Sequence, residues 1–135
     1  MTAQFATARI PDARREVAPD GSDARPLLGL RGGTMALFEL APGQTSIAMS
    51  HETVEEIWLF LAGRGEMWRR QEGREETVPV EQGVCITIPR GTHFQFRALG
   101  DAVLSAVGVT MPPWPGDAEA TRVEGKWPST FPPTG

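Results

Sequence analysis

Short apolar stretches alternate with turn residues along most of the chain, and this rhythm predicts β-strands joined by tight connections. Glycine and proline mark the turns, as at Gly32 and Gly33 or at Pro42 and Gly43. The predicted strands are residues 35–40, 45–51, 56–62, 64–70, 76–80, 84–88, 94–98 and 103–109. Their spacing is typical of a sandwich or a barrel, so we expect an all-β protein.

The predicted strand 56–62 is the most hydrophobic segment, and apolar side chains occupy both of its faces. Alternate residues of a strand point to opposite sides. One face carries Glu56, Trp58 and Phe60, and the other carries Ile57, Leu59 and Leu61. Neither face can lie in water without cost, so one should line a barrel and the other should pack on a second sheet or a partner subunit. We therefore expect a homodimer.

The two ends of the chain lack this alternation. Residues 1–24 are polar and broken by proline and glycine, which predicts an irregular N-terminal arm. Six of the 12 prolines fall between positions 112 and 133, together with Trp114 and Trp127. We expect residues 111–135 to form an extended, proline-rich C-terminal tail whose tryptophans cover the barrel or a neighbouring subunit. The core of a single domain would then span about residues 25–110.

Composition supports a small, turn-rich β protein. The 135 residues suffice for one domain, and 15 glycines with 12 prolines argue against a helical bundle. The net charge is −4, and arginines alternate with glutamates between residues 69 and 76, which argues against nucleic-acid binding. The single cysteine, Cys85, cannot form an internal disulfide bond. With no apolar run long enough for a membrane span, we expect a cytoplasmic protein that binds no membrane.

Two sets of residues carry a recognisable spacing. The first set is Gly43, Met49, His51, Glu56 and Gly63, and the second is Gly83, Pro89, Gly91 and His93. This arrangement resembles the two-part signature of the cupin superfamily, in which a glycine, a His-x-His pair, a glutamate and a glycine precede a Gly…Pro-x-Gly…His motif. The resemblance implies a small jelly-roll β-barrel with ligands pointing into its mouth. Many cupins are dimers.

The chain departs from the family at its metal ligands. Metal-binding cupins present three histidines and one glutamate, whereas Met49 stands here at the first histidine position. Only Thr92 separates Gly91 from His93, where the family has two residues. An ungapped alignment places Phe94 at the ligand position, and strand alternation would then point His93 away from the cavity unless the loop is reshaped.

Two hypotheses follow for the site. In the first, His51, Glu56 and His93 hold a divalent transition metal (Fe, Mn, Ni, Zn or Cu), with Met49 as a weak ligand if the metal is copper. In the second, no metal binds, and His51 pairs with Glu56 as general base or ligand anchor. The residues predicted to line the pocket are Met49, Trp58, Phe60, Gln95 and Phe96.

The sequence predicts a small cupin-type enzyme that acts on a small organic molecule in an aromatic-lined barrel, with a metal held by the reduced His and Glu set. Oxygen-dependent oxidation, isomerisation and cyclisation or lyase chemistry all occur on this fold, so the reaction stays open. One alternative is a metal-free binding or sensing module. Another is a metal-free isomerase or cyclase that uses His51 as its base.

Overall fold

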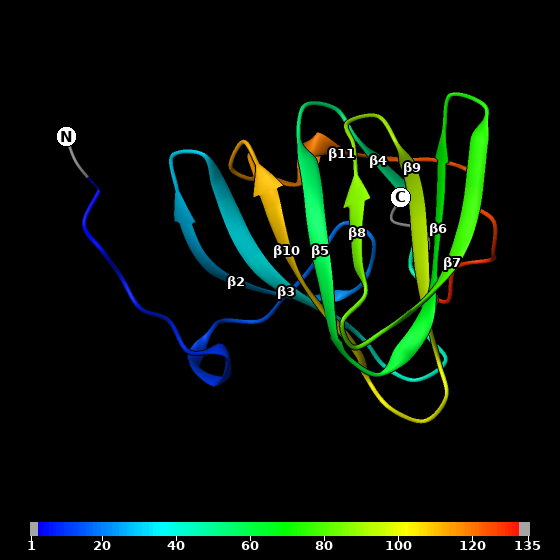
Figure 1. The fold of residues 1–135 in the computed structure, drawn as a ribbon, viewed down its shortest axis with the longest axis horizontal. Coiled ribbons are helices and arrows are strands. Elements are labelled where there is room, and N and C mark those ends of the chain that lie inside the picture. Colours follow the sequence, from blue (N-terminus) through cyan, green and yellow to red (C-terminus); the bar gives the residue numbers. More distant parts are fainter. Residues whose placement is uncertain (1–2, 133–135) are drawn as a thin grey trace.

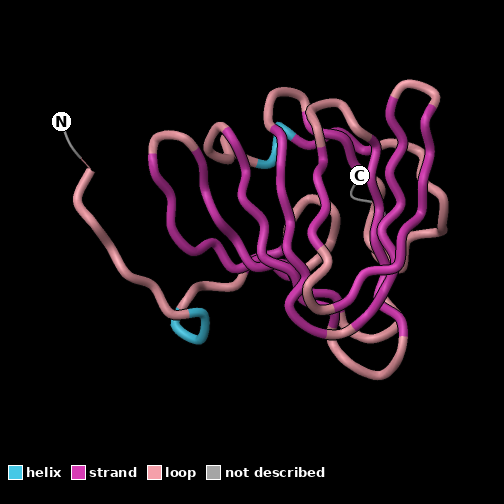
Figure 2. The backbone as a smooth tube through the Cα atoms, in the orientation of Figure 1, coloured by secondary structure: helices cyan, strands magenta, loops and turns pink. Residues whose placement is uncertain are grey.

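The structure, a computed structural model, describes residues 3–132 and consists almost entirely of β-strands (Figure 1). Two short 3₁₀ helices, η1 and η2, interrupt the strands near the chain ends (Figure 2). The elements are η1 (Ile10–Asp12), β1 (Glu16–Val17), β2 (Asp23–Leu30), β3 (Gly33–Leu40), β4 (Met49–His51), β5 (Glu55–Ala62), β6 (Arg64–Gln71), β7 (Arg74–Glu81), β8 (Cys85–Ile88), β9 (His93–Leu99), β10 (Leu104–Met111), η2 (Asp117–Glu119) and β11 (Ala120–Arg122).

The strands form two antiparallel sheets that face each other. One sheet has the order β1-β2-β3-β10-β5-β8, and the other has the order β11-β4-β9-β6-β7. Figure 1 shows the first sheet on the left and the long β6–β7 hairpin at the right edge. The sheets do not close into a continuous barrel, but their arrangement is that of a jelly roll, which confirms the predicted fold class.

The core lies between the sheets and follows from strand alternation. On β5, Trp58 and Phe60 are 1% and 0% exposed, whereas Leu59 on the opposite face is 41% exposed. From the facing sheet, Met67 of β6 and Phe96 of β9 complete the apolar layer. The predicted inward face of β5 is therefore the buried one.

Both chain ends take part in the sheets, beyond what the sequence pattern predicted. β1 pairs with the start of β2, and β11 pairs with β4. Beyond β11 the chain runs along the second sheet, where the Thr130 amide donates to the Thr45 carbonyl. The predicted strand 45–51 is shorter than expected, since only Met49–His51 forms regular pairs. Within residues 3–132, no helix has the length and apolarity needed to cross a membrane.

Gly65 of β6 allows two strands to approach closely. A Cβ atom at this position would lie 2.0 Å from the Arg97 carbonyl oxygen on β9. We expect Gly65→Ala to lower the free energy of unfolding by about 2 kcal/mol or more, because the strands must separate to admit the methyl group. Chemical denaturation measures the change. Gly32→Ala, where a Cβ meets no atom within 4 Å, should have little effect, and an equal loss in both variants would contradict this account.

Candidate functional site

A cavity of about 240 Å³ opens between the sheets, at the end where β4, β5, β9 and β10 meet the two terminal segments. Its apolar lining includes four aromatic residues, and its polar groups are four carboxylic acids, one histidine, two threonines and one arginine at the rim. The lining includes Arg14, Glu16, Asp20, Thr34, Phe38, Met49, His51, Glu56, Trp58, Phe94, Thr110, Trp114 and Asp117, together with smaller aliphatic residues.

Glu56 reaches this cavity because it shares the inward face of β5 with Trp58. The Trp58 indole Nε1–H donates to Glu56 Oε1 at 3.2 Å, and the Thr110 hydroxyl of β10 donates to Oε2. The residue is 3% exposed. Burial raises the pKa of the Glu56 carboxyl to about 7 despite these two hydrogen bonds. Glu56 therefore exchanges its proton near neutral pH.

His51 ends β4 and lies beside Glu56. The distance from His51 Nδ1 to Glu56 Oε1 is 3.7 Å, which is too long for a hydrogen bond. The imidazole packs edge-on against Phe94 and Trp114, with ring centroids 5.2 and 5.3 Å away. Burial lowers the pKa of His51 to about 4. At neutral pH its ring is uncharged, and Nδ1 is buried without a hydrogen-bond partner among the described residues.

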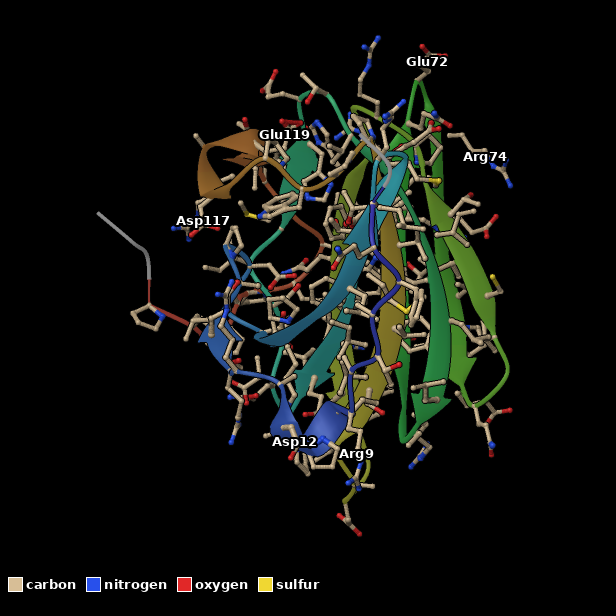
Figure 3. All side chains as sticks on the ribbon, turned by 90° about the vertical axis from the view of Figure 1, so that its left-hand side faces the viewer. Arg9, Asp12, Glu72, Arg74, Asp117 and Glu119 are labelled. Carbon is tan, nitrogen blue, oxygen red and sulfur yellow. The ribbon has the colours of Figure 1, made fainter. Side chains whose placement is uncertain are left out.

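Glu119 of η2 fixes the loop between the two site residues. Its carboxylate accepts hydrogen bonds from the Thr53 amide, the Thr53 hydroxyl and the Val54 amide, and its backbone carbonyl accepts one from the Glu52 amide. These hydrogen bonds lower the pKa of Glu119 against the opposing effect of its burial. Figure 3 shows Glu119 and Asp117 together on the segment leading into β11. The C-terminal segment thus holds the loop that joins His51 to Glu56.

Asp20, from the connection between β1 and β2, adds a second buried carboxyl to the cavity. Its Oδ1 accepts hydrogen bonds from the Ser22 amide and hydroxyl. Burial raises the pKa of Asp20, and the charge of Asp20 in turn raises the pKa of Glu56. The cavity therefore contains two carboxyls that disfavour each other's ionisation.

Of the three predicted metal ligands, His51 and Glu56 lie together in the cavity, but His93 does not join them. Phe94 lines the cavity, and His93, its neighbour on β9, therefore points to the opposite face of the strand. The tight turn before β9 causes this, because Gly91 has a φ of 82° and the Thr92 amide bonds back to the Pro89 carbonyl. Within residues 3–132, no group of three or more His, Cys, Asp or Glu side chains could hold a metal ion. The residues present do not fit the predicted three-ligand centre.

The predicted pocket residues divide into three groups. Met49 and Trp58 line the cavity. Phe60 and Phe96 lie deeper in the core, where each packs against Trp58. Gln95 does not line the cavity: it points to the outer face of β9, where its side chain bonds the Ser46 carbonyl and both backbone groups of Trp127. Gln95 therefore anchors the C-terminal segment.

The sequence matches a family profile described as the cupin domain over residues 36–110. This match spans more than half of the chain and includes both motif regions. The chain belongs to the cupin family. Comparison with curated proteins finds no match.

Solved structures show the same fold at low sequence identity. A predicted oxalate decarboxylase from Thermotoga maritima is 19% identical, with a TM-score of 0.67, and the match covers 79% of this cupin and 99% of that chain. Pac13, a nucleoside dehydratase, is 14% identical, with a TM-score of 0.70 and coverage of 89% and 92%. CapF from Staphylococcus aureus is 17% identical, with a TM-score of 0.69, and the match covers 84% of this cupin and 32% of that chain. At these identities the likeness shows the fold alone.

Four residues of the site were not singled out as chemical groups from the sequence of this cupin. They are Asp20, Thr110, Trp114 and Glu119. Asp20 and Glu119 lie in polar terminal segments with no periodicity, so only tertiary packing brings Asp20 to the cavity and Glu119 to the loop after His51. Trp114 had a weak signal, since a tryptophan in a proline-rich tail suggested that it covers part of the barrel. Thr110 lies just beyond the predicted end of its strand.

The raised pKa of Glu56 predicts a specific pH dependence of stability. The ordinary pKa is 4.5, so between pH 4.5 and about 7 the unfolded chain loses a proton that the folded protein keeps. Unfolding therefore becomes easier as pH rises, and the penalty is complete above about pH 7. Glu56→Gln lacks this penalty. We expect its advantage in unfolding free energy over the wild type to grow by about 3 kcal/mol between roughly pH 4 and pH 8.

Denaturant titrations across this pH range measure the difference. Glu55→Gln is the matched control, because Glu55 is exposed on the opposite face of the same strand. The difference in unfolding free energy between Glu55→Gln and the wild type should change little with pH. A difference for Glu56→Gln that stays constant across the range would contradict the buried, ionisable carboxyl described here.

Proposed function

We propose that this cupin is a small-molecule enzyme that catalyses proton transfer on a substrate bound in the aromatic cavity, with Glu56 as the acid and base. The observation that carries this proposal is a buried carboxyl beside a buried imidazole in one cavity, and burial displaces their pKa values in opposite directions. The pKa of Glu56 is about 7 and the pKa of His51 is about 4. Glu56 Oε1 and His51 Nδ1 are 3.7 Å apart. A carboxyl with a pKa near neutral pH is suited to both accepting and donating a proton.

His51 is not the base in this proposal, although a histidine in a cavity is often expected to be one. An imidazole with a pKa of about 4 is a weak base, so His51 is less suited than Glu56 to abstract a proton. Its neutral ring can instead hold a polar group of the substrate through Nδ1. The Trp58 and Thr110 donors keep the Glu56 carboxyl in one orientation. Isomerisation and elimination are the reaction classes that such a pair serves.

A metal is not part of this mechanism, because the donor set does not support one. His51 and Glu56 supply two ligands, whereas catalytic metal centres usually have three protein ligands. Met49 and Phe94 stand at the remaining family positions and offer only a thioether and a phenyl ring. Activity should therefore persist after prolonged treatment with a chelator such as EDTA.

The alternative function is a binding or sensing module. Both terminal segments help to enclose the cavity, from Arg14 to Asp20 and from Trp114 to Ala120, and such an enclosure also suits ligand retention. A binding module would take up the same molecules without exchanging their protons. A single type of experiment therefore separates the two functions.

Solvent exchange of substrate protons tests the proposal. Small carbonyl compounds with acidic C–H groups, with and without an amino group, are incubated with the protein in deuterated water, and loss of the C–H signal is followed by NMR. We expect the rate to rise roughly tenfold per pH unit below about pH 7 and to level off above it, because Glu56 must be ionised to accept the proton. Glu56→Gln should slow the exchange by about 100-fold or more.

Glu55→Gln again serves as the control and should retain the wild-type rate. His51→Gln should slow the exchange while the pH profile keeps its midpoint near 7. Exchange that survives unchanged in Glu56→Gln, or that requires an added metal, would refute the proposed role. Binding of these compounds without exchange would favour the sensing module.

We further propose that the outer face of the first sheet forms a homodimer interface. Ile57, Leu59 and Leu61 of β5 are 43%, 41% and 38% exposed there. On β10, which pairs with β5, Val107 and Val109 lie opposite Leu59 and Ile57 and extend the same apolar surface. A contiguous apolar patch of this kind is typical of a protein–protein contact.

Leu59→Arg tests the interface, because a charge at the centre of the patch opposes burial against a second copy. We expect the wild type to sediment as a dimer and Leu59→Arg as a folded monomer in analytical ultracentrifugation. Glu75→Arg, at the exposed tip of the β6–β7 hairpin, should remain dimeric. A wild type that stays monomeric at high concentration would contradict this prediction.

A further inference from the structure

Carboxylic acids outnumber cationic groups around the cavity. Four acidic residues line it, namely Glu16, Asp20, Glu56 and Asp117, against the single cation of Arg14. Arg14 is a rim residue whose side chain is 74% exposed, and its guanidinium already pairs with Glu16 at 3.3 Å. The deepest acids, Asp20 and Glu56, are 6% and 3% exposed. The described lining thus places two carboxyl groups in the interior and leaves its one cation near solvent.

A second observation points to a missing hydrogen-bond donor. His51 is 6% exposed, and its Nδ1 atom has no hydrogen-bond partner among the described residues. A buried polar atom without a partner costs about 1–3 kcal/mol, so such atoms are usually satisfied by a ligand or water. Nδ1 lies 3.7 Å from Glu56 Oε1, and a ligand nitrogen with two N–H groups could donate to both.

The cavity wall supplies a third feature. Phe38 and Trp58 stack with ring centroids 4.9 Å apart, and Phe94 and Trp114 flank the His51 ring. Aromatic rings attract cations through their negative faces, and they also shield a charged group from water. Aromatic walls combined with buried carboxyls form a chemical setting that favours an organic cation over an anion or a purely apolar molecule.

We infer that the ligand of this cavity is a small organic amine, bound as its ammonium cation between Glu56 and His51 with its carbon skeleton against the aromatic wall. This inference deepens the proposed function by naming the substrate class. In the Nε2–H tautomer, His51 Nδ1 accepts one ammonium hydrogen, and the Glu56 carboxylate accepts another. Asp20 supplies a second negative charge within the same enclosure.

Binding of a cation should be coupled to proton release. An ammonium group beside Glu56 favours its ionised form, so a carboxyl with a pKa of about 7 loses its proton on binding below neutral pH. The titratable groups that face it are His51 on β4 and Asp20 after β1, with Arg14, Glu16 and Asp117 at the rim. Of these, Asp20 also has a raised pKa and can contribute to the release.

Three probes of nearly equal size test the ligand class: benzylammonium, benzyl alcohol and benzoate. Their binding to the full-length protein is measured by calorimetry at about pH 6 and pH 8, in buffers of different ionisation enthalpy. We expect benzylammonium to bind at least about tenfold more tightly than benzyl alcohol, and benzoate to bind more weakly than either. Benzylammonium should release a proton at the lower pH and bind more tightly at the higher one.

Three variants test which carboxyl groups bind the ammonium cation. Glu56→Gln should weaken benzylammonium binding about tenfold or more and reduce proton release, while benzyl alcohol binding changes little. Asp20→Asn should weaken benzylammonium binding to a smaller extent. Glu55→Gln, whose carboxylate lies outside the cavity, should match the wild type. Chemical shifts of the His51 ring confirm that the probe occupies this cavity, with the outward-facing His93 as the internal reference.

The outcomes separate this inference from the proposed function. Tighter binding of benzyl alcohol or benzoate in the same cavity would overturn the cationic ligand and leave Glu56 available for proton transfer. Failure of all three probes to perturb His51 would also overturn it. Conversely, tight benzylammonium binding would uphold the inference. If no bound amino compound then exchanged its C–H protons, the enzymatic function would be refuted.

Discussion

Burial of the Glu56 carboxyl is the constraint on which the site depends. β5 must turn Trp58 and Phe60 inward to fill the core, and the same alternation carries Glu56 into the cavity. Because the carboxyl cannot reach bulk water, the Trp58 and Thr110 donors must satisfy its oxygens. Its raised pKa and its position beside His51 both follow from this placement.

The sequence motifs predicted the fold, and they pointed to two residues of the candidate site. His51 and Glu56 were predicted because their spacing matches the family signature, and the structure places both in one cavity. The direction of His93 was not settled by the sequence: it was predicted as a metal ligand although strand alternation pointed it away, and Phe94 lines the cavity instead. Gln95 could not be placed, because alternation alone leaves open which face of a strand is inward.

The remaining groups could not be predicted, because their positions depend on contacts between distant segments. Asp20 is held by Ser22 and by the path of the chain between β1 and β2. Glu119 reaches the β4–β5 loop only because β11 pairs with β4 on the edge of the second sheet. Neither segment shows the period of a strand or helix, so local sequence patterns contain no information about these contacts.

The hydrogen bonds between Glu119 and the β4–β5 loop bear on the order in which the protein folds during its synthesis. Synthesis proceeds from the N-terminus, so β4 and β5 leave the ribosome long before η2 does. The Thr53 and Val54 amides have no carboxylate to bind until residue 119 has emerged. A nascent chain can therefore assemble much of its sheet framework while the pocket is still unfinished. The loop that joins His51 to Glu56 is therefore held in place only after η2 has emerged.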